Sequence, residues 1–537
     1  MSNKILHPAL AVWMAAASAA GVWAQSSPPP QDPRASSGRV LNLTLAECLD
    51  KALKANLDLT IEAFSPEMAE ASLQETKEKY LPQFTLSSYY QNLDTPSTWG
   101  VEGPTVKTKE DYVYLNVRQN IPLGTTVDLN MFSRRTDTSR AFTTINPSYY
   151  SRVRFDLTQP LLRNFGPKVN RYSAIKAESQ RDKSVAALKT TLLGTIFNVE
   201  QAYWNLYYSR ENLRVQEMSL AQSRESFKKT QEAVRIGSKS SIDLLKNETE
   251  VASYEDSVLS ARASVEKQEN ALKALLNMPV GPAAAEVPPA DSPSLAPVDK
   301  PTVERRAVTF AEALRVSLAE RPEIASSESQ VADAVLDIGY YRNQLLPQLD
   351  LQFSYWNPGQ SGVRYVFQDN NPLSGVIIDK ITGSRADSFR DLFKRAYRNV
   401  SLQLNLSVPL ANLLSRANLS KAKLAEEQAR LQLQKQRQTV EVEVLEAVKD
   451  LETTGRKIES STRYRELMEK QVEAESQRYE LGLASSEWLF DYQRRLAQAK
   501  ASEIRAVIDH KIALAKLDKV MGTTLKSKGL TFRDYEF

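Results

Sequence analysis

The sequence predicts a mixed α and β protein built as a two-fold internal repeat, in which each copy carries strands and one long helical hairpin. A seven-residue apolar repeat runs through residues 168–277, and most of this hairpin occurs again 245 positions later, at residues 413–522. The stretch before each hairpin also recurs, at an offset of 265 positions, and includes a Leu-Pro-Gln motif followed by alternating apolar residues. Chance agreement over so long a register is negligible, so the chain contains two copies of one unit.

Residues 1–24 are typical of a secretory signal peptide. Lys4 precedes a short apolar run that ends near the small residues Val22 and Ala24, and a membrane anchor is the less favoured alternative. Residues 25–42 are rich in Pro and Ser at their start, and we expect a disordered N-terminal segment there. The rest of the sequence has no run of eighteen apolar residues, so only β-strands remain available for crossing a membrane.

Cys48 is the sole cysteine, which excludes a disulfide framework. The letters before it resemble a lipoprotein acylation box, but Glu47 replaces the small residue that such a box requires. We therefore expect a small buried thiol on an amphipathic helix and a chain without lipid. The net charge is only +4 and the charges are interspersed along helices, so we expect no nucleic-acid binding.

Each copy is expected to open with a helix that begins at a threonine cap. Thr44 is followed three residues later by Glu47, and Thr309 by Glu312, which is the spacing of a capping box. We expect each helix to continue to the next Leu-Pro, where proline ends it.

The strands are expected at residues 81–162 in the first copy and 346–410 in the second. Both segments alternate apolar and polar residues over part of their length, which predicts strands with one apolar face. The first copy has additional strand-like residues, 112–132, and the sequence leaves open whether they form a further hairpin in the sheet or a surface loop. Four strands cannot close a barrel alone, so several chains would have to contribute to one.

Aromatic residues gather at the ends of these strands and in the loops between them. Ordinary β-propensity explains some of them. The predicted export favours a belt of aromatic side chains at a membrane interface. The residues concerned are Tyr89, Tyr90, Trp99, Tyr149, Tyr150, Tyr355, Trp356 and Tyr365.

The two long hairpins are expected to be coiled coils with glycines at their tips. In the first, an arm of about 67 residues, or roughly 100 Å, reaches Gly237, and an arm of about 36 residues, or roughly 54 Å, returns. The second has the equivalent Gly482, and Arg465 interrupts its apolar seam. The seam of the first arm is Val185, Leu192, Val199, Leu206, Leu213, Leu220, Phe227 and Val234.

The predicted division of the chain follows from the repeat. The first copy covers residues 43–278 and the second covers 304–522. A Pro/Ala-rich linker, residues 279–303, joins them, and residues 523–537 form a C-terminal tail.

The chain resembles the outer-membrane efflux protein family, the TolC-like exit ducts of Gram-negative bacteria. The resemblance covers residues 43 to about 521, and it rests on the two helix starts, the two Leu-Pro-Gln strand starts, the strand ends at Gln159–Leu161 and Val408–Leu410, and the two glycine tips. It implies a homotrimer in which the strands form one outer-membrane β-barrel and the helices form a periplasmic α-barrel. The periplasmic tips would meet an adaptor, or membrane fusion protein, bound to an inner-membrane pump.

The resemblance also implies two sets of site residues. One is the adaptor-docking tips, where short or polar side chains would leave the backbone open: Arg235, Gly237, Ser238, Ser241, Gly482, Leu483 and Ser486. The other is the tunnel entrance, where some family members carry a ring of acidic residues. The residues of this chain at the matching places are Asp243, Glu487, Trp488 and Asp491.

We expect no enzyme activity, cofactor or metal site. Cys48 and His510 have no partners at the spacing of a catalytic triad or a metal site, and no phosphate-binding glycine loop is present. The energy for transport would therefore come from a partner. Two alternatives remain: a general diffusion porin, which would spend more of its chain on strands, and a soluble periplasmic coiled-coil scaffold or adaptor, which would leave the aromatic strands unexplained.

Overall fold

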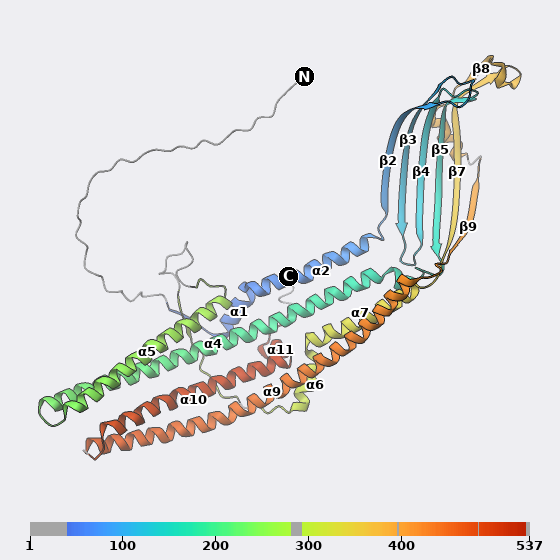
Figure 1. The fold of residues 1–537 in the computed structure, drawn as a ribbon. Coiled ribbons are helices and arrows are strands. Elements are labelled where there is room, and N and C mark those ends of the chain that lie inside the picture. The colour runs from blue at the N-terminus through green and yellow to red at the C-terminus, as the bar shows by residue number, and fades with distance from the viewer. Residues whose placement is uncertain (1–39, 281–292, 305, 395–396, 482, 533–537) are drawn as a thin grey trace, which may run out of the picture.

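The computed structural model describes residues 40–280, 293–304, 306–394, 397–481 and 483–532. Long helices lie side by side at one end of the molecule, and a sheet of long strands stands at the other (Figure 1). The expected signal peptide, most of the segment 25–42 and the middle of the linker 279–303 lie outside the described residues. Among the described helices, none is both long and apolar enough to span a membrane.

The first copy contains its strands and helices in the predicted order. Its elements are β1 (Val40–Leu43), α1 (Leu45–Ala55), α2 (Leu57–Glu78), β2 (Gln83–Pro96), β3 (Thr105–Asn120), β4 (Thr126–Thr138), β5 (Ile145–Pro160), α3 (Pro167–Asn170), α4 (Tyr172–Arg235) and α5 (Ser241–Leu275).

The second copy repeats this order with fewer long strands. Its elements are β6 (Ser294–Pro297), α6 (Phe310–Glu320), α7 (Pro322–Asn343), β7 (Gln348–Phe367), β8 (Ile377–Ile381), α8 (Arg385–Phe393), β9 (Asn399–Ser407), α9 (Leu413–Glu480), α10 (Ser486–Val520) and α11 (Thr524–Lys528), with short 3-10 turns at Gln368–Asn370 and Pro372–Ser374.

The helix that opens each copy is broken once, where we expected a continuous helix. Thr44 and Glu47 form the predicted capping box, and Thr309 accepts the bond from the Glu312 amide in the second copy. The first helix then ends before Asn56, whose side chain caps α2 by accepting from the Leu59 amide. At the equivalent place in the second copy, Pro322 begins α7 and has no amide hydrogen to continue α6.

Among the described residues, seven strands form one antiparallel sheet, with the path β2-β3-β4-β5-β7-β8 and with β9 paired to β7. Residues 112–132 therefore belong to a hairpin in the sheet, because β3 and β4 pair along their length. The sequence left the strand count of the first copy open. With this hairpin, six long strands lie side by side: β2, β3, β4, β5, β7 and β9 (Figure 1).

The sheet has an apolar face and a polar face, because its register places apolar residues beside apolar residues and polar residues beside polar residues on neighbouring strands. On the apolar face the row is Phe84, Val117, Leu129, Phe155, Tyr355 and Val400. The next row, one residue further along the strands, lies on the polar face and is Gln83, Arg118, Asp128, Asp156, Ser354 and Ser401.

Helix α8 lies against the apolar face of the sheet, over β5 and β7. The hydroxyls of Ser388 and Ser151 are 2.7 Å apart, and Arg385 pairs with Asp111. The close approach depends on Gly359, since a Cβ there would lie 2.0 Å from the Ser388 carbonyl oxygen. Only the part of the apolar face nearest β8 is covered in this way.

Each long helix is accompanied along its whole length by two shorter ones. Helix α2 and then α5 pack on α4, and α7 and then α10 pack on α9, while α10 also packs against α4 (Figure 1). The main core lies where these helices meet α1, the β1–β6 pair and α11. Its most deeply buried members include Leu192, Ile196, Val199, Leu206, Leu295 and Ile508.

The linker and the segment before the first copy meet at this core. Residues 40–42, which we placed in a disordered segment, instead form β1 with Leu43 and pair in parallel with β6. The Tyr203 hydroxyl, buried beneath this pair, donates to Asp299 at 2.9 Å. A strand that two distant segments build together carries no local signal strong enough to be predicted.

The apolar seam of α4 is deeply buried only in the middle of the helix, whereas we expected it to continue without a break. Leu192, Val199 and Leu206 are fully buried, but Leu220 and Phe227 are only half-buried. Toward the tip, the buried side chains of α4 are small or polar, namely Ser209, Ser223 and Thr230, while those of α5 include Asn247, Tyr254, Val258 and Ala261. The small side chains of α4 let α5 approach closely, so the larger apolar side chains of α4 lie on the flank of the hairpin.

Candidate functional site

The first tip is a complete helix-ending motif built on Gly237. The Gly237 amide donates to the Val234 carbonyl at 3.0 Å and the Ser238 amide donates to the Ala233 carbonyl at 2.8 Å, which is the Schellman pattern. Gly237 has φ +77°, and a Cβ there would meet no neighbour within 4 Å. The glycine is therefore required by backbone conformation and not by crowding.

The second tip follows the same hydrogen-bond register, 245 residues later. Gly482 lies outside the described residues, but the Leu483 amide donates to the Arg478 carbonyl at 2.8 Å, as Ser238 does to Ala233. The two tips lie side by side at the end of the helices (Figure 1). They are linked by Lys239, whose ammonium contacts the hydroxyl and lies 4.2 Å from the ring centroid of Tyr479.

The predicted docking residues lie at these turns. Arg235 is exposed and pairs with Glu232 in its own helix, while the Ser238 hydroxyl donates to the Ala233 carbonyl. Ser241 and Ser486 are the first residues of α5 and α10, and Leu483 is exposed.

Sequence reasoning missed four exposed apolar side chains at the same tips. These are Ile236, Ile242, Leu245 and Leu481. Each lies beside a tip glycine or among the first five residues of the returning helix, outside the buried seam. The sequence did hold a signal for them, namely apolar residues at a turn that has no core beneath it. Exposed apolar patches of this kind mark interaction surfaces.

Asp243, which we assigned to the tunnel entrance, is engaged in a helix cap. Its carboxylate accepts from the Ser240 amide, and the Ser240 hydroxyl accepts from the amides that begin α5, forming a capping box. The structure thus gives Asp243 a local role at the start of α5, and it does not line the pocket that contains the other three predicted residues.

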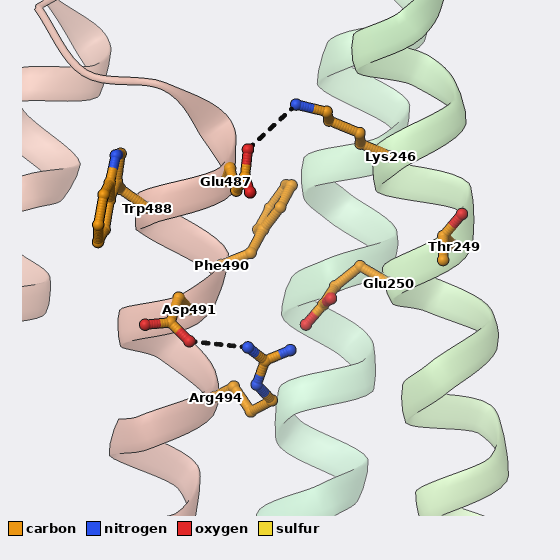
Figure 2. Close-up of a pocket in the computed structure, with 8 residues that line it drawn as sticks. All are labelled: Lys246, Thr249, Glu250, Glu487, Trp488, Phe490, Asp491 and Arg494. Atoms are coloured by element: carbon orange, nitrogen blue, oxygen red, sulfur yellow. Dashed lines mark hydrogen bonds and ion pairs between the residues drawn. The ribbon is translucent and has the colours of Figure 1, made fainter.

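Glu487, Trp488 and Asp491 line one pocket of about 400 Å³ between the two hairpins (Figure 2). Glu487 Oε2 lies 3.3 Å from Lys246 Nζ of α5, and Asp491 Oδ1 lies 2.7 Å from Arg494 within α10. The remaining lining residues, which sequence reasoning missed, are Lys246, Thr249, Glu250, Phe490 and Arg494.

Glu250 is the carboxylate of this pocket whose pKa is raised. Burial raises the pKa of Glu250, the nearby Arg494 lowers it, and Asp491 raises it further, so that its pKa stays above the usual value. Burial also raises the pKa of Tyr254, one turn along α5, to about 12. The Lys246–Glu487 pair is therefore an ion pair between α5 and α10, and Glu250 is the carboxylate whose charged form burial disfavours.

The two side chains considered as catalysts are both buried among the helices. His510 is buried, with Nδ1 3.2 Å from the Thr454 hydroxyl and Nε2 3.0 Å from the Glu304 carbonyl. Cys48 is fully buried in α1, and burial raises the pKa of its thiol to about 12. In the described part of the chain, no group of three or more His, Cys, Asp or Glu is placed to hold a metal ion.

The sequence was compared with models of known protein families and with curated protein sequences. The sequence model of the outer membrane efflux protein family matches residues 48–278 and 313–523, one match in each copy. No curated protein sequence is significantly similar to the chain.

Several solved structures share the fold at low sequence identity. A membrane protein from Pseudomonas aeruginosa is 17% identical with a TM-score of 0.62, and the match covers 92% of this chain and 96% of that one. The CmeC outer membrane channel of Campylobacter jejuni is 16% identical with a TM-score of 0.61, covering 91% and 90%. The MtrE outer membrane channel of Neisseria gonorrhoeae, in its open state, is 20% identical with a TM-score of 0.59, covering 92% and 94%.

At these identities the solved structures establish the fold, while the two matches to the family model cover most of the sequence. The chain therefore belongs to the outer membrane efflux protein family and is a protein of the outer membrane.

Proposed function

We propose that three copies of the chain form a passive exit duct of a multicomponent efflux or type I secretion system. The sheets would close into one outer-membrane barrel, and the helices would form a periplasmic tunnel. The tips would dock to a periplasmic adaptor bound to an inner-membrane pump, which supplies the energy. The family and its structural relatives are channels and not enzymes.

The open edges of the sheet carry this proposal. In the described part of the chain, β2 pairs with β3 alone and β9 pairs with β7 alone. Both edge strands expose apolar side chains, including Phe84 and Leu86 on β2 and Leu402, Leu404 and Leu406 on β9. Unpaired backbone groups are not tolerated in lipid, so each edge needs a strand from another chain.

Pairing β2 of one copy with β9 of the next joins unlike edges, and such head-to-tail contacts form a closed ring when the rotation between copies is a whole fraction of a turn. Six long strands from each of three copies would give a barrel of about eighteen strands. The half-buried apolar side chains on the flank of the first hairpin, such as Leu220 and Phe227, would pack against a neighbouring copy.

The exposed apolar side chains at the tips support the docking step. Ile236 and Leu481 hold the same position in the two hairpins, and both are exposed. A soluble scaffold would account for these tips, but it would leave the exposed apolar face of the sheet without a partner.

Crosslinking from the tips tests the proposed docking. A photo-crosslinking residue at Leu483 should capture a periplasmic adaptor in cells, whereas the same residue at Arg456, exposed midway along α9, should not. The variant Gly482→Trp should assemble and reach the outer membrane but lose both export and crosslinking. Normal export by Gly482→Trp would rule out the tips as the docking surface.

A further inference from the structure

Four aromatic rings form a continuous row across strands β2 to β5. Tyr89 and Tyr112 have ring centroids 4.8 Å apart, Tyr112 and Phe132 are 5.6 Å apart, and Phe132 and Tyr150 are 6.3 Å apart. The register places all four on the polar face of the sheet, since Tyr89 faces Tyr112, and Arg134 faces both Tyr112 and Tyr150.

Two arginines stand among these rings without an acidic partner. The Arg152 guanidinium lies 5.9 Å from the Phe132 ring centroid, and its Nε is buried with no hydrogen-bond partner among the described residues. Arg134 is exposed, and within the described chain it forms no hydrogen bond or ion pair. We call the set the aromatic–arginine cluster: Tyr89, Tyr112, Phe132, Arg134, Tyr150 and Arg152.

Several other charged groups on the polar face are already paired. Arg118 lies 2.7 Å from Asp128, and Arg154 lies 2.7 Å from Asp156. Glu110, two residues before Tyr112 on β3, accepts hydrogen bonds from Gln91 at 2.9 Å and from Thr136 at 3.2 Å. In the cluster, by contrast, guanidinium groups and rings meet without a carboxylate between them.

Cross-strand aromatic pairs stabilise sheets by themselves, and this accounts for the ring contacts. It does not account for the arginines, because a buried Nε without a partner costs free energy that a neighbouring aspartate would remove. An anion with a planar ring would satisfy both features. Its anionic oxygen atoms would accept hydrogen bonds from the guanidinium groups, and its ring would stack on the tyrosines.

We propose that the aromatic–arginine cluster binds planar aromatic anions, such as aromatic carboxylates, as they pass through the pore. The proposal rests on the proposed duct, since the polar face becomes a pore wall only when the sheets close into a barrel. In a trimer three equivalent clusters would lie at one level of the barrel.

Ion-current recordings of the full-length protein in planar lipid bilayers test this binding. We expect 1-naphthoate to block the current in a concentration-dependent way, and cyclohexanecarboxylate, which has the same charge but no planar ring, to block it far less. The double variant Arg134→Gln/Arg152→Gln should raise the half-blocking concentration of 1-naphthoate by about tenfold or more.

Two further variants separate binding from folding. Arg118→Gln, on the same face but paired with Asp128, should leave the half-blocking concentration unchanged. Arg134→Lys, at an exposed position, keeps the charge and loses the planar fork, and it should give an intermediate value.

The outcomes distinguish this site from the duct itself. A conducting channel that 1-naphthoate blocks equally in the wild type and in the double variant would overturn the binding site alone. Equal block by the two carboxylates would also overturn it. A protein that forms no conducting channel would overturn the proposed duct, and with it this site.

Discussion

Lys246 and Glu487 form an ion pair between the two hairpins, with 3.3 Å between Nζ and Oε2, although they are 241 residues apart in the sequence. The pair lies close to the tips, in the pocket that Asp491 and Arg494 also line (Figure 2). Both side chains are largely exposed, at 45% and 75%, so the pair contributes little to stability. Its position makes it a contact that must break if the hairpins separate.

Reversing one charge of this pair should loosen the tip without unfolding the protein. Lys246→Glu should raise the conductance of the channel through repulsion by Glu487, while stability changes by less than about 1 kcal/mol. The exchange Lys246→Glu/Glu487→Lys should restore the original conductance. Arg456→Glu, which breaks an exposed pair with Glu452 inside α9 and away from the tips, serves as the control and should leave conductance unchanged. An exchange that fails to restore conductance would show that the pair does not hold the hairpins together.

The raised pKa of Glu250 predicts a stability that falls as pH rises. Because burial raises the pKa in the folded state, the folded protein binds the proton more tightly, and the stability from the protonated form is lost above that pKa. Glu250→Gln should therefore melt at a higher temperature than the wild type at about pH 7.5, and the difference should vanish near pH 4. Melting curves at both values measure this. Glu248→Gln, at an exposed position in the same helix, should change neither curve; a Glu250→Gln variant that is less stable at about pH 7.5 would contradict the assignment.

The backbone conformation of Gly237 predicts a graded response to substitution. Since φ is +77° and the space around a Cβ is open, Gly237→Ala should lower the free energy of unfolding by about 1 kcal/mol through strain alone. Gly237→Asn should lower it by less, because asparagine tolerates this conformation. Denaturant titrations of the three proteins give the comparison, and equal losses for Ala and Asn would argue against a conformational cause.

We expect a different response to substitution at Gly359, because there the neighbouring atoms leave no room for a side chain. A methyl group would meet the Ser388 carbonyl at 2.0 Å, so Gly359→Ala should push α8 off the sheet or cost about 1–3 kcal/mol. Protease cleavage within residues 382–398 should then become faster than in the wild type. Gly100→Ala, which meets nothing within 4 Å, provides the matched control. Unchanged cleavage would mean that α8 is held by other contacts.

Much of the fold followed from patterns that repeat within the sequence. The Thr44 cap and the Gly237 turn were predicted because capping and helix termination depend on a few adjacent residues. The membership of β3 and β4 in the sheet was left open, since alternation marks a strand but does not say which strand it pairs with. The broken helix at Asn56 was missed because asparagine within an amphipathic pattern is a weak stop signal.

The candidate site was predicted less well than the fold. Glu487, Trp488 and Asp491 do line one pocket, but Lys246 and Glu250 were missed because contacts between hairpins depend on how α10 packs against its neighbours. Asp243 was assigned to the entrance although its spacing from Ser240 is that of a capping box, which was visible in the sequence.

The mass of the purified complex tests the central claim most directly. The open edges of β2 and β9 predict that detergent-solubilised protein from the outer membrane has the mass of three chains, with its strand content intact. Substituting proline on the β9 edge, as in Leu404→Pro, should reduce the trimer fraction by removing an amide that pairing requires. A monodisperse monomer with full strand content would contradict the account.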